Sequence, residues 1–183
     1  MLGSVFLPYH IKKYCKRKVQ RFTRSFDAAD TIGLICSYQT LIKGHQVHDL
    51  IDKLKKQDKS VKILVFYDNI LPIRYTSSKI LSGSTSSFSK RDLSFLGFWS
   101  KGPVKTFVSN KFDFLINLDS VSNKFIDSVL AESKALCRVG PYTAGSGFLE
   151  LMVKTERNDP KQYIDDTLKL LGAIRNRVLK KVK

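Results

Sequence analysis

Four polar residues follow apolar runs of the sequence, at places where a ligand could bind. Ser37 ends the first run, Asp68 and Asn69 follow the second, and Asp119 follows the third. Ligands of open α/β sheets bind beyond the carboxyl ends of the strands, and a carboxylate there can bind a sugar hydroxyl or a metal ion. Asp and Asn after a strand also commonly cap turns. Both interpretations stay open at this point.

The segment 140–147 (GPYTAGSG) is a candidate phosphate-binding loop, because glycines let backbone N–H groups approach an anion. Gly140 and Gly145 would supply that access. The segment lacks the Gly-Lys-Ser/Thr of a P-loop, and Glu150 stands where a dinucleotide-binding GxGxxG needs its third glycine. The pattern therefore favours a flexible hairpin connection over a phosphate site.

Basic residues gather at the two ends of the chain. The sequence carries 32 Lys and Arg against 16 Asp and Glu, a net charge of +16. Residues 1–26 hold seven bases and no acid, residues 169–183 hold six bases and no acid, and residues 27–168 hold 19 bases against 16 acids. Such segments attract polyanions, which predicts RNA, the ribosome or an anionic membrane surface as partner. The predicted contacts are Lys12, Lys13, Lys16, Arg17, Arg21, Arg24, Arg175, Lys180 and Lys181.

The basic N-terminal segment has the spacing of an amphipathic helix. Ile11, Tyr14, Cys15, Val19 and Phe22 recur at steps of three and four, which places them on one face, with the cations on the other. This apolar stripe could dock on the domain and leave the cations to solvent or to phosphate. It could also lie in a lipid interface.

The elements that would position these residues alternate between strands and helices. Continuous or β-branched apolar runs predict strands over 31–37, 61–67, 112–118 and 136–139. Amphipathic spacing predicts helices over 45–57 and 123–134, and a last helix capped by Asp159 with Pro160 at its first position. Residues 148–154 predict a further strand. The link 140–147 is too short for a helical crossover, so this strand is expected to run antiparallel at one sheet edge.

The predicted fold is α/β. We expect a three-layer, Rossmann-like open sheet, mainly parallel, of about five strands with one antiparallel edge strand. Helices flank it, including the basic N-terminal and the C-terminal helix. Residues 1–26 form a basic helical extension, and residues 27–183 form a single domain with a Ser-rich excursion at 68–103.

Several classes of protein are excluded or disfavoured by the sequence. The apolar runs are far shorter than the ~20 residues of a membrane span. The cationic segment follows the first apolar stretch instead of preceding it, which is the wrong order for a secretory signal, so we predict a cytoplasmic location that includes peripheral attachment to the inner membrane. Three widely spaced cysteines match neither a disulfide framework nor a metal knuckle. No catalytic motif, cofactor or metal site is predicted, and nothing positively indicates an enzyme.

Four stretches of the sequence carry a resemblance. They are KILVFYD (62–68), FSKRDLSFLGFWSKGP (88–103), NKFDFLINLD (110–119) and SKALCRVGPY (133–142). The sequence resembles an uncharacterised family of small cytoplasmic proteins from Bacteroidota, a domain of unknown function with a Rossmann-like α/β core. The resemblance implies the fold and no activity, and the Ser-rich stretch 77–89 departs from the family in composition.

Two functions are therefore predicted as alternatives. The first is a non-enzymatic module that binds a polyanionic partner through its basic terminal helices. The second is a nucleotide- or sugar-binding enzyme that acts at the carboxyl ends of the strands, because FDFLINLD followed by a helix and CRVG is similar to the nucleotide-sugar domain of glycosyltransferases. The charge distribution favours the first.

Overall fold

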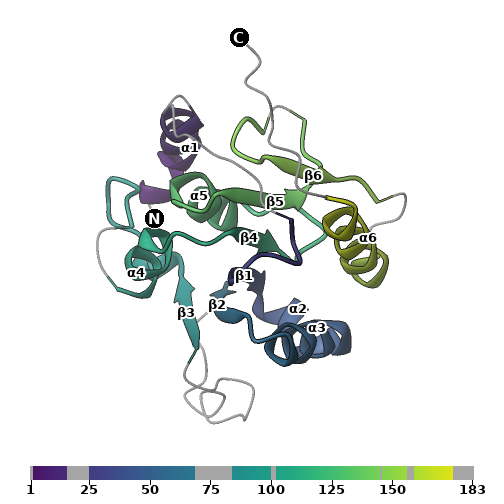
Figure 1. Ribbon diagram of the computed structural model, residues 1–183. Coiled ribbons are helices and arrows are strands. Elements are labelled where there is room, and N and C mark those ends of the chain that lie inside the picture. Colours follow the sequence, from purple (N-terminus) through teal and green to yellow (C-terminus); the bar gives the residue numbers. More distant parts are fainter. Residues whose placement is uncertain are drawn as a thin grey trace.

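The fold is described from a computed structural model of the protein. A six-stranded sheet forms its centre (Figure 1). The structure describes residues 2–15, 25–68, 84–99, 102–144, 146–155 and 159–174. The strands are β1 (Thr31–Ser37), β2 (Ser60–Tyr67), β3 (Thr85–Ser89), β4 (Phe114–Asn117), β5 (Cys137–Pro141) and β6 (Leu151–Val153). They lie in the order β3-β2-β1-β4-β5-β6, and each neighbouring pair is parallel.

Helices cover both faces of the sheet, which confirms the predicted three-layer α/β fold (Figure 1). One layer holds α1 (Leu7–Cys15), α4 (Pro103–Ser109) and α5 (Lys124–Glu132), and the other holds α2 (Tyr38–Lys43), α3 (His45–Lys56) and α6 (Pro160–Ala173). A short 3-10 helix, η1 (Leu2–Val5), precedes α1, and another, η3 (Lys90–Asp92), follows β3. Because strand side chains alternate between the two faces, the sheet divides the core into two apolar clusters.

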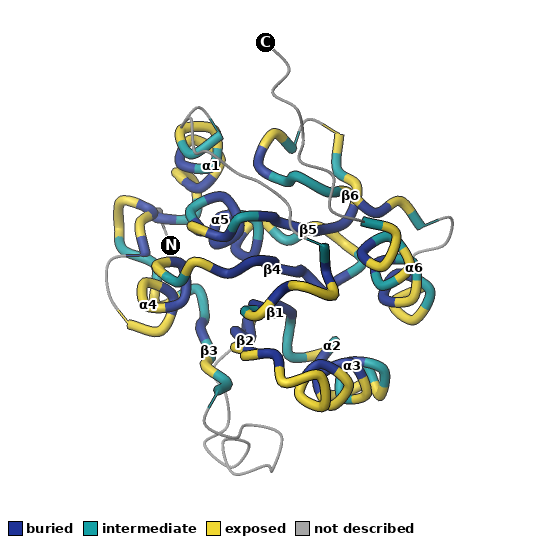
Figure 2. Tube along the Cα trace, in the orientation of Figure 1, coloured by how far each residue is buried: buried dark blue, intermediate teal, exposed yellow. Residues whose placement is uncertain are grey.

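The continuous apolar runs of the central strands are buried, as predicted. The side chains of Ile35, Leu64, Val65, Leu115 and Ile116 are all 0% exposed. A parallel sheet covered on both faces buries the middle of its central strands on both sides. Figure 2 shows dark blue along β4 and β5, and yellow mainly on the helices and loops around the sheet.

The predicted antiparallel edge strand is wrong, because β6 runs parallel to β5. Only three residue pairs join the two strands, from Val139 with Leu151 to Pro141 with Val153. The chain therefore travels back only about 7 Å along the strand direction between them, a distance that residues 142–150 span without a helix. Phe148 is buried among residues of α4 and α5, so this connection crosses the same face of the sheet as α5 does.

The sixth strand, which the sequence analysis did not predict, lies inside the Ser-rich excursion. Residues 85–89 (TSSFS) form β3 at the open edge of the sheet, in parallel register with Ile63 to Tyr67 of β2. Phe88 is the one residue of this strand that is buried. The backbone groups of β2 supply hydrogen bonds to any neighbouring sequence, so a serine-rich segment can pair there despite its weak apolar pattern.

The helix caps follow the sequence signals. The side chain of Asp159 accepts a hydrogen bond from the backbone N–H of Lys161, with Pro160 at the first helical position, as predicted for α6. Asn123 caps α5 in the same way. Among the residues described, none of the helices combines the length and the apolar character that crossing a bilayer requires.

Candidate functional site

The carboxyl ends of β1 and β4 meet at the point where the order of the strands reverses. The order of this sheet is the one found in dinucleotide-binding folds, in which ligands bind at this position. The structure brings two of the predicted residues together there. Asp119 accepts hydrogen bonds at 3.0 Å from both the backbone N–H and the Oγ–H of Ser37. The Oγ of Ser37 also lies 3.1 Å from the Oγ1 of Thr40, at the start of α2.

A second aspartate makes the same contact at the other end of β1. Asp113 precedes β4, and its carboxylate accepts hydrogen bonds at 3.0 Å from the backbone N–H groups of Asp30 and Thr31. The two aspartates that flank β4 thus hold β1 at both of its ends. Because Asp113 has this structural role at the edge where no ligand is expected, we interpret Asp119 likewise as a cap of the β1 terminus.

Burial disfavours the charged form of two carboxyl groups near this edge. Desolvation raises the pKa of Asp119, and its hydrogen bonds from Thr40 and Ser37 oppose that rise. Desolvation, with a smaller contribution from the nearby Asp119, raises the pKa of Asp127, in the first turn of α5, to about 6. The hydroxyl of Ser122 donates to Asp127 at 2.5 Å and acts in the opposite direction. Asp127 was not among the site residues predicted from the sequence, although an acid in the first turn of a predicted helix is a recognisable signal.

Asn117, the last residue of β4, carries an orphaned polar group. Its Oδ1 accepts the backbone N–H of Asp119 at 3.0 Å, and its backbone carbonyl accepts the hydroxyl of Tyr163 at 2.9 Å. The side chain is fully buried, and its Nδ2 finds no acceptor among the described residues. These contacts place a buried polar cluster at the carboxyl end of β4.

The raised pKa of Asp127 gives a prediction about pH. A carboxyl group whose pKa is higher in the folded than in the unfolded chain makes folding bind protons, so its contribution to stability falls as the pH rises from 3.8 to about 6. In Asp127→Asn that contribution is absent. We expect the variant to gain stability relative to the native protein as the pH rises from about 4 to about 7, when urea unfolding is measured at each pH. A difference that does not change with pH would contradict this assignment.

The remaining predicted ligand residues do not join Ser37 and Asp119. Asp68 follows β2 with its side chain 69% exposed, and it forms an ion pair with Lys90. Gly140 lies inside β5, where a Cβ would come within 3.0 Å of the side chain of Leu149. Asn69 and Gly145 lie outside the described residues.

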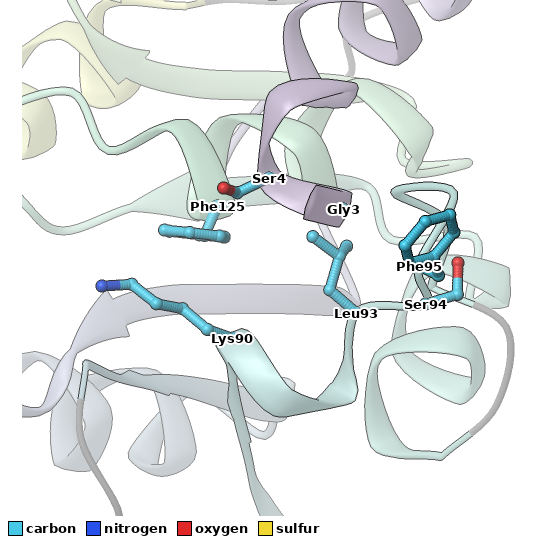
Figure 3. A pocket seen from close by; sticks show the side chains of 7 residues that line it. All are labelled: Gly3, Ser4, Lys90, Leu93, Ser94, Phe95 and Phe125. Carbon is cyan, nitrogen blue, oxygen red and sulfur yellow. The ribbon is translucent and has the colours of Figure 1, made fainter. Parts of the chain in front are cut away.

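A small cavity lies beside Lys90, between η1, the loop after η3 and the start of α5 (Figure 3). Its volume is about 150 Å³, below the several hundred Å³ of typical ligand pockets. Lys90 reaches beneath the ring of Phe125, with its Nζ 5.4 Å from the ring centroid. A second cavity of about 320 Å³ is lined by Lys62, Ser84 and Asn110, among others, at the starts of β2 and β3. That is the edge opposite the one where ligands of open α/β sheets bind.

The basic first helix docks on the domain by its apolar side. Leu7 is buried, and Ile11, Tyr14 and Cys15 pack against the cluster that contains α4 and α5. Lys12 and Lys13 are exposed on the outer side. The predicted amphipathic helix is therefore present as far as Cys15, with its stripe turned to the protein core.

The other basic residues that were predicted to bind a polyanion lie outside the described residues, as do the last two residues of the stripe, Val19 and Phe22. The basic residues are Lys16, Arg17, Arg21, Arg24, Arg175, Lys180 and Lys181.

One known family matches nearly the whole chain. Residues 5–174 match the family of unknown function DUF6913. The chain belongs to the DUF6913 family. This match includes α1, all six strands of the sheet and α6. A search of curated proteins found no match, and neither did a search of solved structures. The assignment to Bacteroidota stays a prediction.

Proposed function

We propose that the protein is a non-enzymatic module that binds a polyanionic partner, either RNA, the ribosome or an anionic membrane surface, through the basic residues of its terminal helices. We further propose that it acts in the cytoplasm, free or attached to the inner membrane. The observation that carries this proposal is the orientation of α1, which packs by its apolar side and exposes Lys12 and Lys13. The chain continues with Lys16, Arg17 and Lys18, and its first 26 residues contain no acid.

The carboxyl ends of β1 and β4, where the strand order reverses, give less support to the alternative function, a nucleotide- or sugar-binding enzyme, than α1 gives to polyanion binding. The strand order favours that alternative. Ser37 and Asp119, however, bond to each other at the place where such a ligand would bind. A rise in melting temperature on adding a nucleotide or nucleotide sugar would favour the enzyme.

The proposal is tested by reversing the two exposed charges in the full chain. In Lys12→Glu/Lys13→Glu, we expect weaker binding to a labelled single-stranded RNA in about 50 mM salt. The plot of log K against log salt should become shallower by about 1.4, since each contact to single-stranded phosphate contributes roughly 0.7.

The matched control is Lys55→Glu/Lys56→Glu, which changes the charge equally. It alters two exposed lysines in the last turn of α3, on the opposite face of the sheet. This control should leave the slope close to the native value if α1 is the binding surface. Equal losses in the two variants would show that only total charge matters, and no loss in either would exclude α1 as a polyanion site.

A further inference from the structure

Exposed apolar side chains gather at one corner of the molecule. Ten large apolar residues are exposed in the described structure, and six of them belong to two short segments, residues 5–9 and 95–98. Val5 and Tyr9 are 69% and 66% exposed, and Phe95 and Leu96 are 67% and 57% exposed. We call these four residues, with Phe6 and Phe98, the corner patch. Contiguous exposed apolar surface on a folded domain marks a site of interaction.

Specific contacts hold the two segments together, so the corner patch is part of the fold. The buried His10 donates from Nε2 to the carbonyl oxygen of Leu96 at 2.8 Å, and its ring centroid lies 3.9 Å from that of Phe98. At Gly3, a Cβ would lie 2.2 Å from the carbonyl oxygen of Ser94. Figure 3 shows Gly3 of η1 beside the loop that carries Ser94 and Phe95.

Gly97 completes this junction. Its φ of +81° lies in the region that favours glycine, and a Cβ there would meet the carbonyl oxygen of Gly3 at 2.8 Å. Gly3 and Gly97 thus lie on the two sides of a close backbone contact. This contact holds the segments that carry the exposed apolar side chains of the corner patch.

The cations of α1 lie next to the corner patch. Lys12 and Lys13 follow Tyr9 by three and four residues, so they share its face one helical turn further on. A helix whose aromatic side chains adjoin lysines matches a membrane interface, where the apolar groups enter the acyl boundary and the lysines reach lipid phosphates. Figure 2 shows α1 at the outer margin of the molecule, with exposed residues along it.

The aliphatic members of the patch favour a bilayer over RNA. Aromatic rings can stack on bases, but Val5 and Leu96 cannot, and they are among the most exposed apolar residues of the patch. The stripe of Ile11, Tyr14 and Cys15 does not serve as the lipid face, because it packs against the core.

We propose that the corner patch docks the protein on an anionic lipid bilayer, with Val5, Tyr9, Phe95 and Leu96 entering the interface while Lys12 and Lys13 contact lipid phosphates. This inference rests on the proposed function and names the polyanion as an anionic membrane surface. The patch could not be predicted from the sequence, because the exposure of its residues depends on the tertiary contact between His10 and Leu96, which lie 86 positions apart.

The test uses the full chain and vesicles of phosphatidylcholine, with or without about one third phosphatidylglycerol. Phe95→Ser/Leu96→Ser should lower the affinity for the anionic vesicles by at least about tenfold, with RNA binding and melting temperature unchanged. Ile42→Ser/Val121→Ser removes two exposed apolar residues that lie outside the patch, and it should bind like the native chain.

A second variant reports insertion directly. The single native tryptophan, Trp99, is buried and donates to Ser128. Leu96→Trp adds a tryptophan in the patch, and Ile42→Trp adds one outside it. Bilayers that contain brominated lipid should quench the fluorescence of Leu96→Trp much more than that of Ile42→Trp.

The outcomes separate this inference from the proposed function. Vesicle binding that depends on Lys12 and Lys13 but not on Phe95 and Leu96, with equal quenching at positions 96 and 42, would overturn the inference and leave the proposed function standing. A loss of RNA binding alone in Phe95→Ser/Leu96→Ser would make the patch an RNA surface and would also overturn it. If neither Lys12→Glu/Lys13→Glu nor Phe95→Ser/Leu96→Ser changed the binding to vesicles or RNA, both proposals would be overturned.

Discussion

Glu150→Ala is expected to lower the free energy of unfolding by about 3–5 kcal/mol. Glu150 forms a two-pronged ion pair with Arg138 of β5, in which Nη2 donates to Oε1 at 2.7 Å and Nε donates to Oε2 at 3.0 Å. The guanidinium is buried, and its Nη1 donates to the carbonyl oxygens of Leu130 and Ala131 at the end of α5. Without the carboxylate, a permanent positive charge stays buried with no countercharge from Glu150.

The prediction is checked by urea unfolding of the native chain and its variants. Asp166→Ala serves as the control, because it removes a half-buried carboxylate whose partner at 3.7 Å, Lys169, is exposed, and it should cost less than about 1 kcal/mol. A similarly small loss in Glu150→Ala would mean that water reaches Arg138 and that the ion pair does not join the edge of the sheet to α5.

Leu115→Ala is expected to cost about 2–5 kcal/mol. Leu115 is fully buried in β4, and it packs so closely on β1 that a Cβ on Gly33 would come within 2.9 Å of its Cδ1. Truncation removes apolar burial and leaves a cavity that the surrounding strands cannot close. The loss should appear as a lower urea midpoint with an unchanged slope.

The matched control for this variant is the same substitution at an exposed position. Leu96→Ala removes the same atoms from a side chain that is 57% exposed, and it should change stability by about 0.5 kcal/mol or less. If Leu115→Ala cost under about 1 kcal/mol, β4 would not be a central element of the core.

The parts of the fold that the sequence predicts are those with local signals. Continuous apolar runs identify β1, β2 and β4, and the pair Asp159 and Pro160 identifies the start of α6. Strand β3 is missed because its pairing depends on the backbone of β2 rather than on its own side chains. The direction of β6 is not predicted because a parallel return is possible without a helix only when the two strands pair over a few residues. The short pairing of β5 with β6 cannot be deduced from the length of the loop between them.

The candidate site shows the same division. The sequence places Ser37 and Asp119 at strand ends, and the structure joins them. The sequence does not reveal that Asp113 makes the same kind of contact at the other end of β1. That contact forms only because β4 pairs with β1 in the sheet. The positive charge of the first helix is evident in the composition. The corner patch beside it is not, because Phe95 and Leu96 reach the helix through tertiary contacts.

Equilibrium binding of the full chain to single-stranded RNA and to anionic vesicles, in about 50 mM salt, tests whether the first helix is the polyanion-binding surface. The native chain is compared with a variant in which Lys12, Lys13, Lys16, Arg17 and Arg21 are all changed to glutamate. We expect the variant to lose most of its binding to both, with an unchanged urea midpoint, because α1 is held to the domain by Leu7 and the other residues of its apolar side. Unchanged binding to both would contradict the account, and the first helix would then be a structural element alone.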